Sequence, residues 1–260
     1  MEDFESAIID YDAAILITDD SDELYYDSLA SRGASYYFLG DFTNAIADLT
    51  LVIDNVTVSV QSYAVRGESY YFQENWQLAL ADFNTVIELD NTNAGSFANR
   101  GLIHYYLGNQ SSALEDWEEA FSLNPDISTS FRDGVQQLIR YELYPTALQR
   151  VNDIILLDAY NGVTRWQNNF YRAYIHLQLG NNLDAILDAT LVIEDGGDEA
   201  LSSMPEILLV RSEGYLNLGF LESGLEDAND YILLAPDDRE GYAMRGNIHF
   251  ADDNFELALS

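Results

Sequence analysis

Apolar and small residues recur at helical spacing in two consecutive runs within one segment of the chain. The first run includes Tyr63, Gly67 and Tyr70, and the second includes Ala79 and Phe83. Residues three or four positions apart lie on one face of an α-helix. The spacing therefore predicts two amphipathic helices separated by a short break.

This pair of runs is repeated along the chain. The phrase RGASYYFLGDFTNAIADLTLVID begins at Arg32, and similar phrases follow it at steps of 34, 34, 34, 38, 39 and 34 residues. Seven copies can be aligned, and they start at Arg32, Arg66, Arg100, Gly134, Arg172, Arg211 and Arg245. Steps of this length indicate one helical unit that is copied and stacked.

Glycine and alanine take fixed places in the repeated phrase. Gly40, Gly108 and Gly180 fall in the break between the two runs, where a residue that accepts a left-handed backbone commonly ends a helix. Gly67 and Gly101 fall inside the first helix, where glycine costs about 1 kcal/mol relative to alanine. We interpret these internal glycines as places where a neighbouring helix comes close.

The repeats divide the whole chain into units. We predict a single solenoid over residues 1–260, with longer connections at 159–165 and 196–204. Its parts are a half unit at 1–21, units at about 26–59, 60–93, 94–127, 128–161, 166–199 and 205–238, and an incomplete unit at 239–260.

These residues carry a resemblance to the tetratricopeptide repeat family. The matching features are the small residue of the first helix, the aromatic residue three positions later (Tyr36, Tyr70), the turn glycine and the alanine of the second helix. The resemblance implies an all-α fold, a right-handed α-solenoid of stacked antiparallel helix pairs. It also implies a scaffold that binds proteins or peptides, with extended peptides lying on the concave face.

An aspartate lies sixteen residues after five of the unit arginines, whereas in the fourth unit Gly134 and Arg150 replace both partners. Joint loss favours an ion pair between the two helices of a unit over two independent surface positions. The predicted pairs are Arg32–Asp48, Arg66–Asp82, Arg100–Asp116, Arg172–Asp188 and Arg211–Asp227. The alternative is a row of arginines lining a groove for an acidic ligand.

Adjacent aromatic residues end the first helices. Neighbouring helical residues point about 100 degrees apart, so one of each pair should be buried and the other should face the concave side. The candidate binding strip comprises Tyr37, Tyr71 and Tyr105, with Phe38, Phe72 and Tyr106 beside them. The alternative is that these rings fill the core between units.

The chain is strongly acidic, with a net charge of -34, eleven arginines and no lysine. Nucleic acid and anionic membranes require a cationic surface, so neither is an expected partner. A lysine-free acidic surface fits a high-salt, extracellular or cell-surface setting, where screening reduces self-repulsion. A cytoplasmic location is the alternative.

Catalytic patterns are lacking in the sequence. Cysteine and lysine do not occur, and neither a glycine-rich phosphate loop nor a His-Glu-x-x-His pattern is present. His104, His176 and His249 take the place of tyrosine in other units, so we expect packed rings rather than metal ligands. We predict no enzyme activity, no cofactor and no metal.

Both termini fall inside a unit, which predicts apolar helix faces without a capping partner. The candidate contact residues are Phe4, Ile8, Tyr11, Ile15, Phe250, Phe255 and Leu259. Such ends could join copies head to tail, although residues 3–9 and 254–260 resemble each other and would claim similar places. We therefore expect a self-assembling structural subunit that forms an extracellular filament or tube. The alternative is an adaptor segment of a longer protein.

Overall fold

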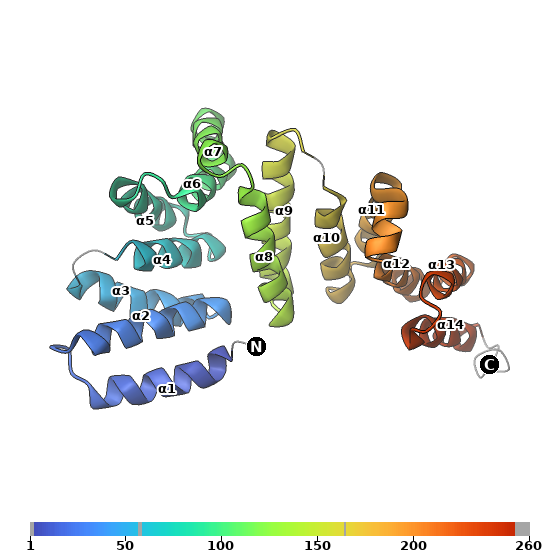
Figure 1. The fold of residues 1–260 in the computed structure, drawn as a ribbon, viewed down its shortest axis with the longest axis horizontal. Coiled ribbons are helices and arrows are strands. Elements are labelled where there is room, and N and C mark those ends of the chain that lie inside the picture. Colours follow the sequence, from blue (N-terminus) through green and yellow to red (C-terminus); the bar gives the residue numbers. More distant parts are fainter. Residues whose placement is uncertain (1–2, 57–58, 164, 253–260) are drawn as a thin grey trace. The chain divides into compact units, whose positions relative to one another are not determined.

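A computed structural model describes residues 3–56, 59–163 and 165–252, which contain fourteen α-helices and no strand (Figure 1). The helices are α1 (Phe4–Ile17), α2 (Glu23–Phe38), α3 (Phe42–Asn55), α4 (Val60–Phe72), α5 (Trp76–Leu89), α6 (Ala94–Tyr106), α7 (Gln110–Leu123), α8 (Ile127–Arg140), α9 (Tyr144–Tyr160), α10 (Trp166–Gln178), α11 (Asn182–Ser203), α12 (Glu206–Leu218), α13 (Leu221–Leu234) and α14 (Arg239–Ala251).

The chain forms two compact units, Met1–Thr146 and Ala147–Ser260. Within each unit, helices joined by short turns pack side by side, as α2 does with α3 and α12 does with α13 (Figure 1). The predicted fold class, all-α with stacked helix pairs, is confirmed. One continuous solenoid over residues 1–260 stays a prediction.

Short polar turns separate the two helices of a repeat. Asp41 precedes α3, and its carboxylate accepts a hydrogen bond from the backbone N–H of Asn44 at 3.1 Å, which caps the helix. Gly40 has a φ of 74°, and a Cβ added there would lie 2.8 Å from a Leu143 side-chain carbon. The positive φ favours glycine here, and the Leu143 side chain would have to shift to admit a Cβ. Glu74 adopts a φ of 58° in the corresponding turn before α5.

Small residues allow the two helices of a repeat to approach closely. Ala45, Ala79 and Ala113 are buried on the second helices of the first compact unit. Gly101 of α6 faces the indole of Trp117 on α7, and a Cβ at position 101 would lie only 2.5 Å from two atoms of that ring. The internal glycine thus makes room for a large side chain from the partner helix.

The second compact unit has its own core, formed by α10, α11 and α12. Its buried members include Ala173, Ala185, Val192 and Ile207. The longer connection expected at residues 196–204 is partly helical, because a helical turn up to Ser203 follows a break at Gly197, where φ is 51° and ψ is -137°. Glycine at that position lets the chain bend and then resume a helix.

Candidate functional site

Each of the five predicted arginine–aspartate pairs forms a two-pronged bridge. In every pair the arginine Nε donates to one carboxylate oxygen and Nη2 donates to the other, over distances of 2.6–2.9 Å. The arginine comes from the first helix of a repeat and the aspartate from the second. Because the aspartates are buried and the arginines half-buried, these pairs tie the two helices together.

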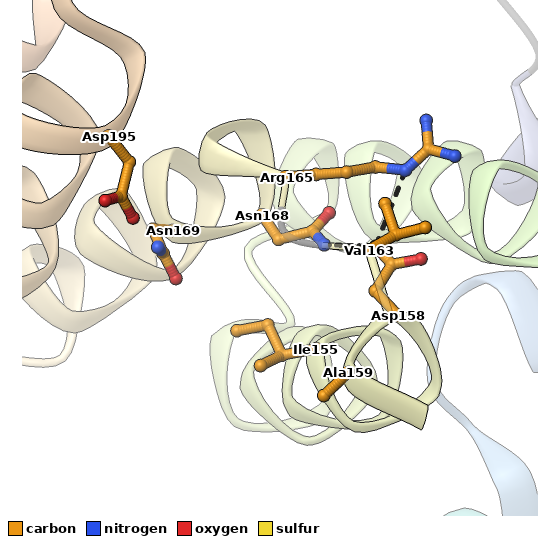
Figure 2. A pocket seen from close by; sticks show the side chains of 8 residues that line it. All are labelled: Ile155, Asp158, Ala159, Val163, Arg165, Asn168, Asn169 and Asp195. Carbon is orange, nitrogen blue, oxygen red and sulfur yellow. Dashed lines mark hydrogen bonds and ion pairs between the residues drawn. The ribbon is translucent and has the colours of Figure 1, made fainter. Parts of the chain in front are cut away.

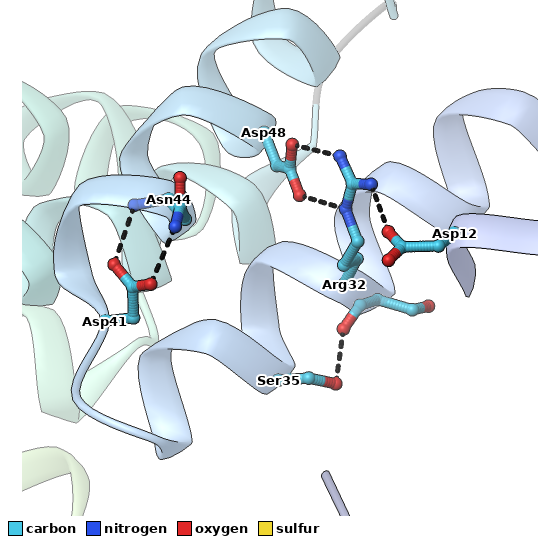
Figure 3. A network of polar contacts seen from close by, with 7 residues as sticks. Asp12, Arg32, Ser35, Asp41, Asn44 and Asp48 are labelled. Carbon is cyan, nitrogen blue, oxygen red and sulfur yellow. Dashed lines mark hydrogen bonds and ion pairs between the residues drawn. The ribbon is translucent and has the colours of Figure 1, made fainter. Parts of the chain in front are cut away.

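The remaining arginine nitrogen contacts the preceding repeat. Nη1 of Arg32 donates to Asp12 of α1 at 2.6 Å, as Figure 3 shows, and Nη1 of Arg66 donates to Thr50 of α3 at 3.1 Å. The same contact recurs from Arg100 to Asn84, Arg172 to Asn152, Arg211 to Thr190 and Arg245 to Asn229. We call this series the arginine ladder. Sequence reasoning missed the third contact, although a polar residue two positions after most of the aspartates was its signal.

Aromatic rings cover several of these guanidinium groups. The guanidinium of Arg66 lies 5.5 Å from the ring centroid of Tyr63 and 5.8 Å from that of Tyr70. Hydrogen bonding to Asp48 raises the pKa of Arg32 above its usual value, although burial alone would lower it. The ladder arginines are therefore engaged inside the protein, which disfavours the alternative role as receptors for an acidic ligand.

The predicted binding strip is divided between the core and the surface. Tyr71 is 0% exposed, so its predicted place on a binding surface is wrong. Tyr37 is half-buried, and its hydroxyl donates to Glu68 of α4, which also accepts a hydrogen bond from Asn99 of α6 at 3.1 Å. Phe72 is half-buried as well. The three exposed members are Phe38, Tyr105 and Tyr106.

These rings belong to a continuous aromatic array in the first compact unit. Neighbouring ring centroids are 4.8–5.9 Å apart, distances at which aromatic pairs attract. In order of contact, the array comprises Phe4, Phe38, Tyr37, Phe42, Phe72, Tyr71, Trp76, Tyr106, Tyr105 and Trp117. Phe42 and Trp76 were missed, although each is visible in the sequence as the aromatic residue that opens α3 or α5.

Residues 94–127 match the family model described as tetratricopeptide repeat. This chain contains a tetratricopeptide repeat. The matched segment holds α6 and α7, with the bridge between Arg100 and Asp116. The same two-helix pattern and bridge recur in α2–α3, α4–α5, α10–α11 and α12–α13, so these pairs are tetratricopeptide-like repeats by structure.

Several solved structures of tetratricopeptide proteins are similar to this chain. One from Parabacteroides merdae is 18% identical, with 90% of this chain and 89% of that chain covered and a TM-score of 0.40. The C-terminal part of a repeat protein from Cytophaga hutchinsonii is 14% identical, with 93% and 94% covered and a TM-score of 0.46. YrrB, described as having an unusual peptide-binding site, is 16% identical, with 68% and 87% covered and a TM-score of 0.46. No curated protein matches.

The contact residues predicted on α1 are only partly buried. Phe4 stacks on Phe38 with ring centroids 4.8 Å apart, and Ile8, Tyr11 and Ile15 are half-buried. The exposed apolar residues of α1 are instead Ile9, Leu16 and Ile17. At α14, Phe250 is exposed. The predicted contacts Phe255 and Leu259 lie outside the described residues.

One small pocket lies where α9 meets the start of α10 (Figure 2). Its volume is about 90 Å³, and its polar lining includes Asp158, which accepts a hydrogen bond from Asn168 Nδ2 at 2.7 Å. The Nε atom of Arg165 lies 3.7 Å from the same carboxylate. The space is that of about three water molecules, too small for most substrates.

Among the described residues, no three or more histidine, cysteine, aspartate or glutamate side chains are grouped so that they could hold a metal ion. In the same part of the chain, no helix combines the length and the apolar character needed to cross a membrane.

Proposed function

We propose that this protein is a non-enzymatic scaffold for protein–protein interaction, and that it self-assembles head to tail into an extracellular filament or tube. Tetratricopeptide repeats generally serve as interaction scaffolds rather than as enzymes. Head-to-tail contact joins two different surfaces of the same chain and therefore generates open assemblies.

The observation that carries the proposal is a pair of complementary half-sites. Arg245 is the seventh residue of α14, as Arg66 is of α4, and Asp10 is the seventh residue of α1, as Asp82 is of α5. Within the described residues, Arg245 forms its ladder contact with Asn229 but no ion pair, and Asp10 forms none either. In the proposed contact, the guanidinium of Arg245 in one copy pairs with the carboxylate of Asp10 in another.

Apolar residues are exposed on α1 next to Asp10. Ile9 lies beside it on α1, and Leu16 and Ile17 are each 85% exposed at the end of that helix. The residues at the same three positions of the second helices α3, α5 and α7 are exposed as well, so these apolar side chains border the proposed contact rather than fill it. Docking α1 of one copy on α14 of another would place Asp10 opposite Arg245, and it requires α1 to take the place that residues 254–260, which resemble residues 3–9, would otherwise claim.

The extracellular setting is supported by charge alone. Copies that each carry a net charge of -34 repel one another, and salt shortens the range of that repulsion from about 30 Å at 0.01 M to about 3 Å at 1 M. Assembly is therefore expected to need substantial ionic strength.

A charge-swap experiment tests the assembly. Light scattering and negative-stain microscopy of the unmodified protein, over a concentration series in about 0.5 M salt, should reveal particles that grow. Asp10→Arg and Arg245→Asp should each prevent growth, because each brings like charges together. The double variant should restore growth, since it reverses the pair.

The controls keep folding separate from assembly. Asp10 is exposed and forms no ion pair within the described residues, so Asp10→Arg should retain the circular dichroism and melting temperature of the unmodified protein. Arg245→Asp also loses the contact with Asn229 and the ring of Tyr242, so its circular dichroism must match that of the unmodified protein before its growth is compared. An unmodified protein that stays monomeric at the highest concentration would overturn self-assembly. Growth of both single variants would overturn the proposed register.

The alternative is an adaptor that presents its surface to a different protein. It is favoured by Tyr105 and Tyr106, which remain 41% and 44% exposed at the end of the aromatic array. Large exposed rings are common anchors in protein interfaces. The monomeric outcome of the light-scattering experiment would favour this role.

A further inference from the structure

Three leucines form an exposed row on α11. Leu183, Leu187 and Leu191 are spaced by four residues and are 61%, 54% and 40% exposed. Residues at this spacing lie on one face of a helix, and the row extends about 12 Å along it. We call these three residues the leucine row.

Other repeats show that the fold does not require leucine at these positions. The leucine row occupies the second, sixth and tenth residues of α11. The same positions hold Ser111, Glu115 and Glu119 in α7, and Glu222, Glu226 and Asp230 in α13. All six are exposed, and both helices pack normally in their pairs. The fold thus accepts glutamate or aspartate at these positions, so it does not need leucine there. Exposed leucines at such positions are suited to contact with a partner.

The opposite face of α11 packs in the core and holds the helix that carries the leucine row in place. Ala185, Ala189 and Val192 are completely buried in the core of the second compact unit. On the adjoining helix α12, a Cβ added to Gly214 would lie 2.9 Å from Ile186, so the two helices are in close contact. The leucine row is thus presented by a well-packed helix rather than by a loop.

Acidic side chains flank the row. Asp184 is exposed in the first turn of α11, and Glu194 and Asp195 are exposed after Leu191. α11 contains no basic residue, and the chain contains no lysine. An apolar row bordered by carboxylates is complementary to an apolar surface bordered by cations, whereas a second copy of α11 would bring carboxylates together.

We propose that the leucine row binds an amphipathic helix whose apolar face is flanked by lysine or arginine. A straight row at four-residue spacing packs into the groove of another helix, and side chains at every third or fourth position of that helix supply the anchors. This inference rests on the proposed scaffold role but not on head-to-tail assembly, because α11 is distinct from α1 and α14.

The test uses a fluorescent, synthetic 18-residue helix with leucine at every third or fourth position and lysine on both sides of that row. Anisotropy titrations in about 150 mM salt compare the unmodified protein with the variant Leu183→Ser, Leu187→Glu, Leu191→Glu. That variant copies the residues of α7, so it should keep its helical content and melting temperature. We expect its affinity for the peptide to fall at least tenfold.

Matched controls distinguish peptide binding at the leucine row from nonspecific binding elsewhere on the protein. Leu233→Glu removes an exposed leucine from α13, outside the row, and should leave peptide affinity unchanged. A peptide with glutamate in place of each lysine should bind at least tenfold more weakly. The Asp10→Arg and Arg245→Asp variants should bind the peptide normally, so a failure of head-to-tail assembly is distinguishable from a failure here.

Three outcomes would overturn the inference. They are absence of peptide binding by the unmodified protein, equal affinity for the triple variant, and equal affinity for the glutamate peptide. Sedimentation supplies a further check. If the triple variant abolishes self-association that the Asp10 and Arg245 variants retain, the occupant of the row is a second copy of the chain rather than a basic helix.

Discussion

Arg66 donates two hydrogen bonds to Asp82, from Nε to Oδ2 at 2.9 Å and from Nη2 to Oδ1 at 2.7 Å. The carboxylate is nearly inaccessible, and the guanidinium is largely covered by Tyr63 and Tyr70. The same bridge recurs in the four other arginine–aspartate pairs.

Arg66→Ala should lower the free energy of unfolding by about 3 to 5 kcal/mol, because it leaves the Asp82 carboxylate buried without a counterion. Urea denaturation followed by circular dichroism measures the loss. Arg140→Ala is the control, since exposed Arg140 has only a 3.3 Å contact to Gln137 and should cost under about 0.5 kcal/mol. Equal stabilities for the two variants would contradict a structural role for the ladder.

Replacing both partners of the bridge should be milder than removing one. Arg66→Met combined with Asp82→Leu leaves no unpaired charge, and such replacements are often near neutral. The double variant should therefore be more stable than Arg66→Ala in the same urea titration. A double variant as unstable as the single one would mean that packing of the arginine stem, rather than charge, dominates.

Two helical glycines should respond in opposite directions to alanine. Gly101→Ala should destabilise, because its Cβ would collide with the buried indole of Trp117. Gly134→Ala on α8 should stabilise by about 0.5 to 1 kcal/mol, because a Cβ there meets nothing within 4 Å and alanine favours the helix. Thermal melts of both variants provide the measurement. Stabilisation by both would show that α6 and α7 tolerate a wider separation.

Tyr231 should make stability fall in alkali. Burial, reinforced by the 2.8 Å hydrogen bond to Asp238, raises the pKa of this phenol. Its contribution is therefore complete below the unfolded pKa of about 10 and is lost as pH rises towards the folded pKa. Urea titrations at several pH values between 7 and 11 should show this decline, and Tyr231→Phe should reduce it.

The control for Tyr231 is Tyr242→Phe, which removes an exposed hydroxyl that donates to the carbonyl of Pro236 at 3.0 Å. At pH 7, Tyr231→Phe should cost about 1.5 to 3 kcal/mol, because it deletes a hydrogen bond to a charged acceptor. Tyr242→Phe should cost less and should leave the alkaline decline intact. A decline unchanged in Tyr231→Phe would assign it to other tyrosines.

Salt should stabilise the protein. A net charge of -34 favours expansion, and the Debye length falls from about 10 Å at 0.1 M to about 3 Å at 1 M. The melting temperature should therefore rise across this range of sodium chloride. Sodium thiocyanate at low concentration and matched ionic strength should produce a similar initial rise. A melting temperature that falls with sodium chloride would contradict a dominant role for self-repulsion.

The parts predicted well from sequence are those that depend on spacing within one repeat. The interval of sixteen residues between Arg66 and Asp82 could be read directly, because joint replacement by Gly134 and Arg150 linked the two positions. The period likewise indicated helix pairs without any knowledge of their packing. Both are local relations that stacking does not alter.

Contacts that depend on the angle between helices could not be predicted in the same way. Tyr37, Tyr71 and Tyr105 were treated as equivalent, yet Tyr71 is fully buried whereas Tyr105 is exposed. Tyr71 packs edge-on against Trp76, while Phe42 stacks on Phe72 from the neighbouring position. Trp76, which opens α5, helps to cover Tyr71, whereas α7 opens with Gln110.

The Nη1 contacts of the ladder have a geometric consequence. Five of these guanidinium groups bridge their own repeat to the one before it, as Arg66 does between Asp82 and Thr50. A guanidinium is planar and rigid, whereas a lysine ammonium is a single point on a flexible stem. The distance between the second helices of successive repeats is therefore set by the width of the guanidinium group that contacts both. Lysine could not set that distance, and none occurs in the chain.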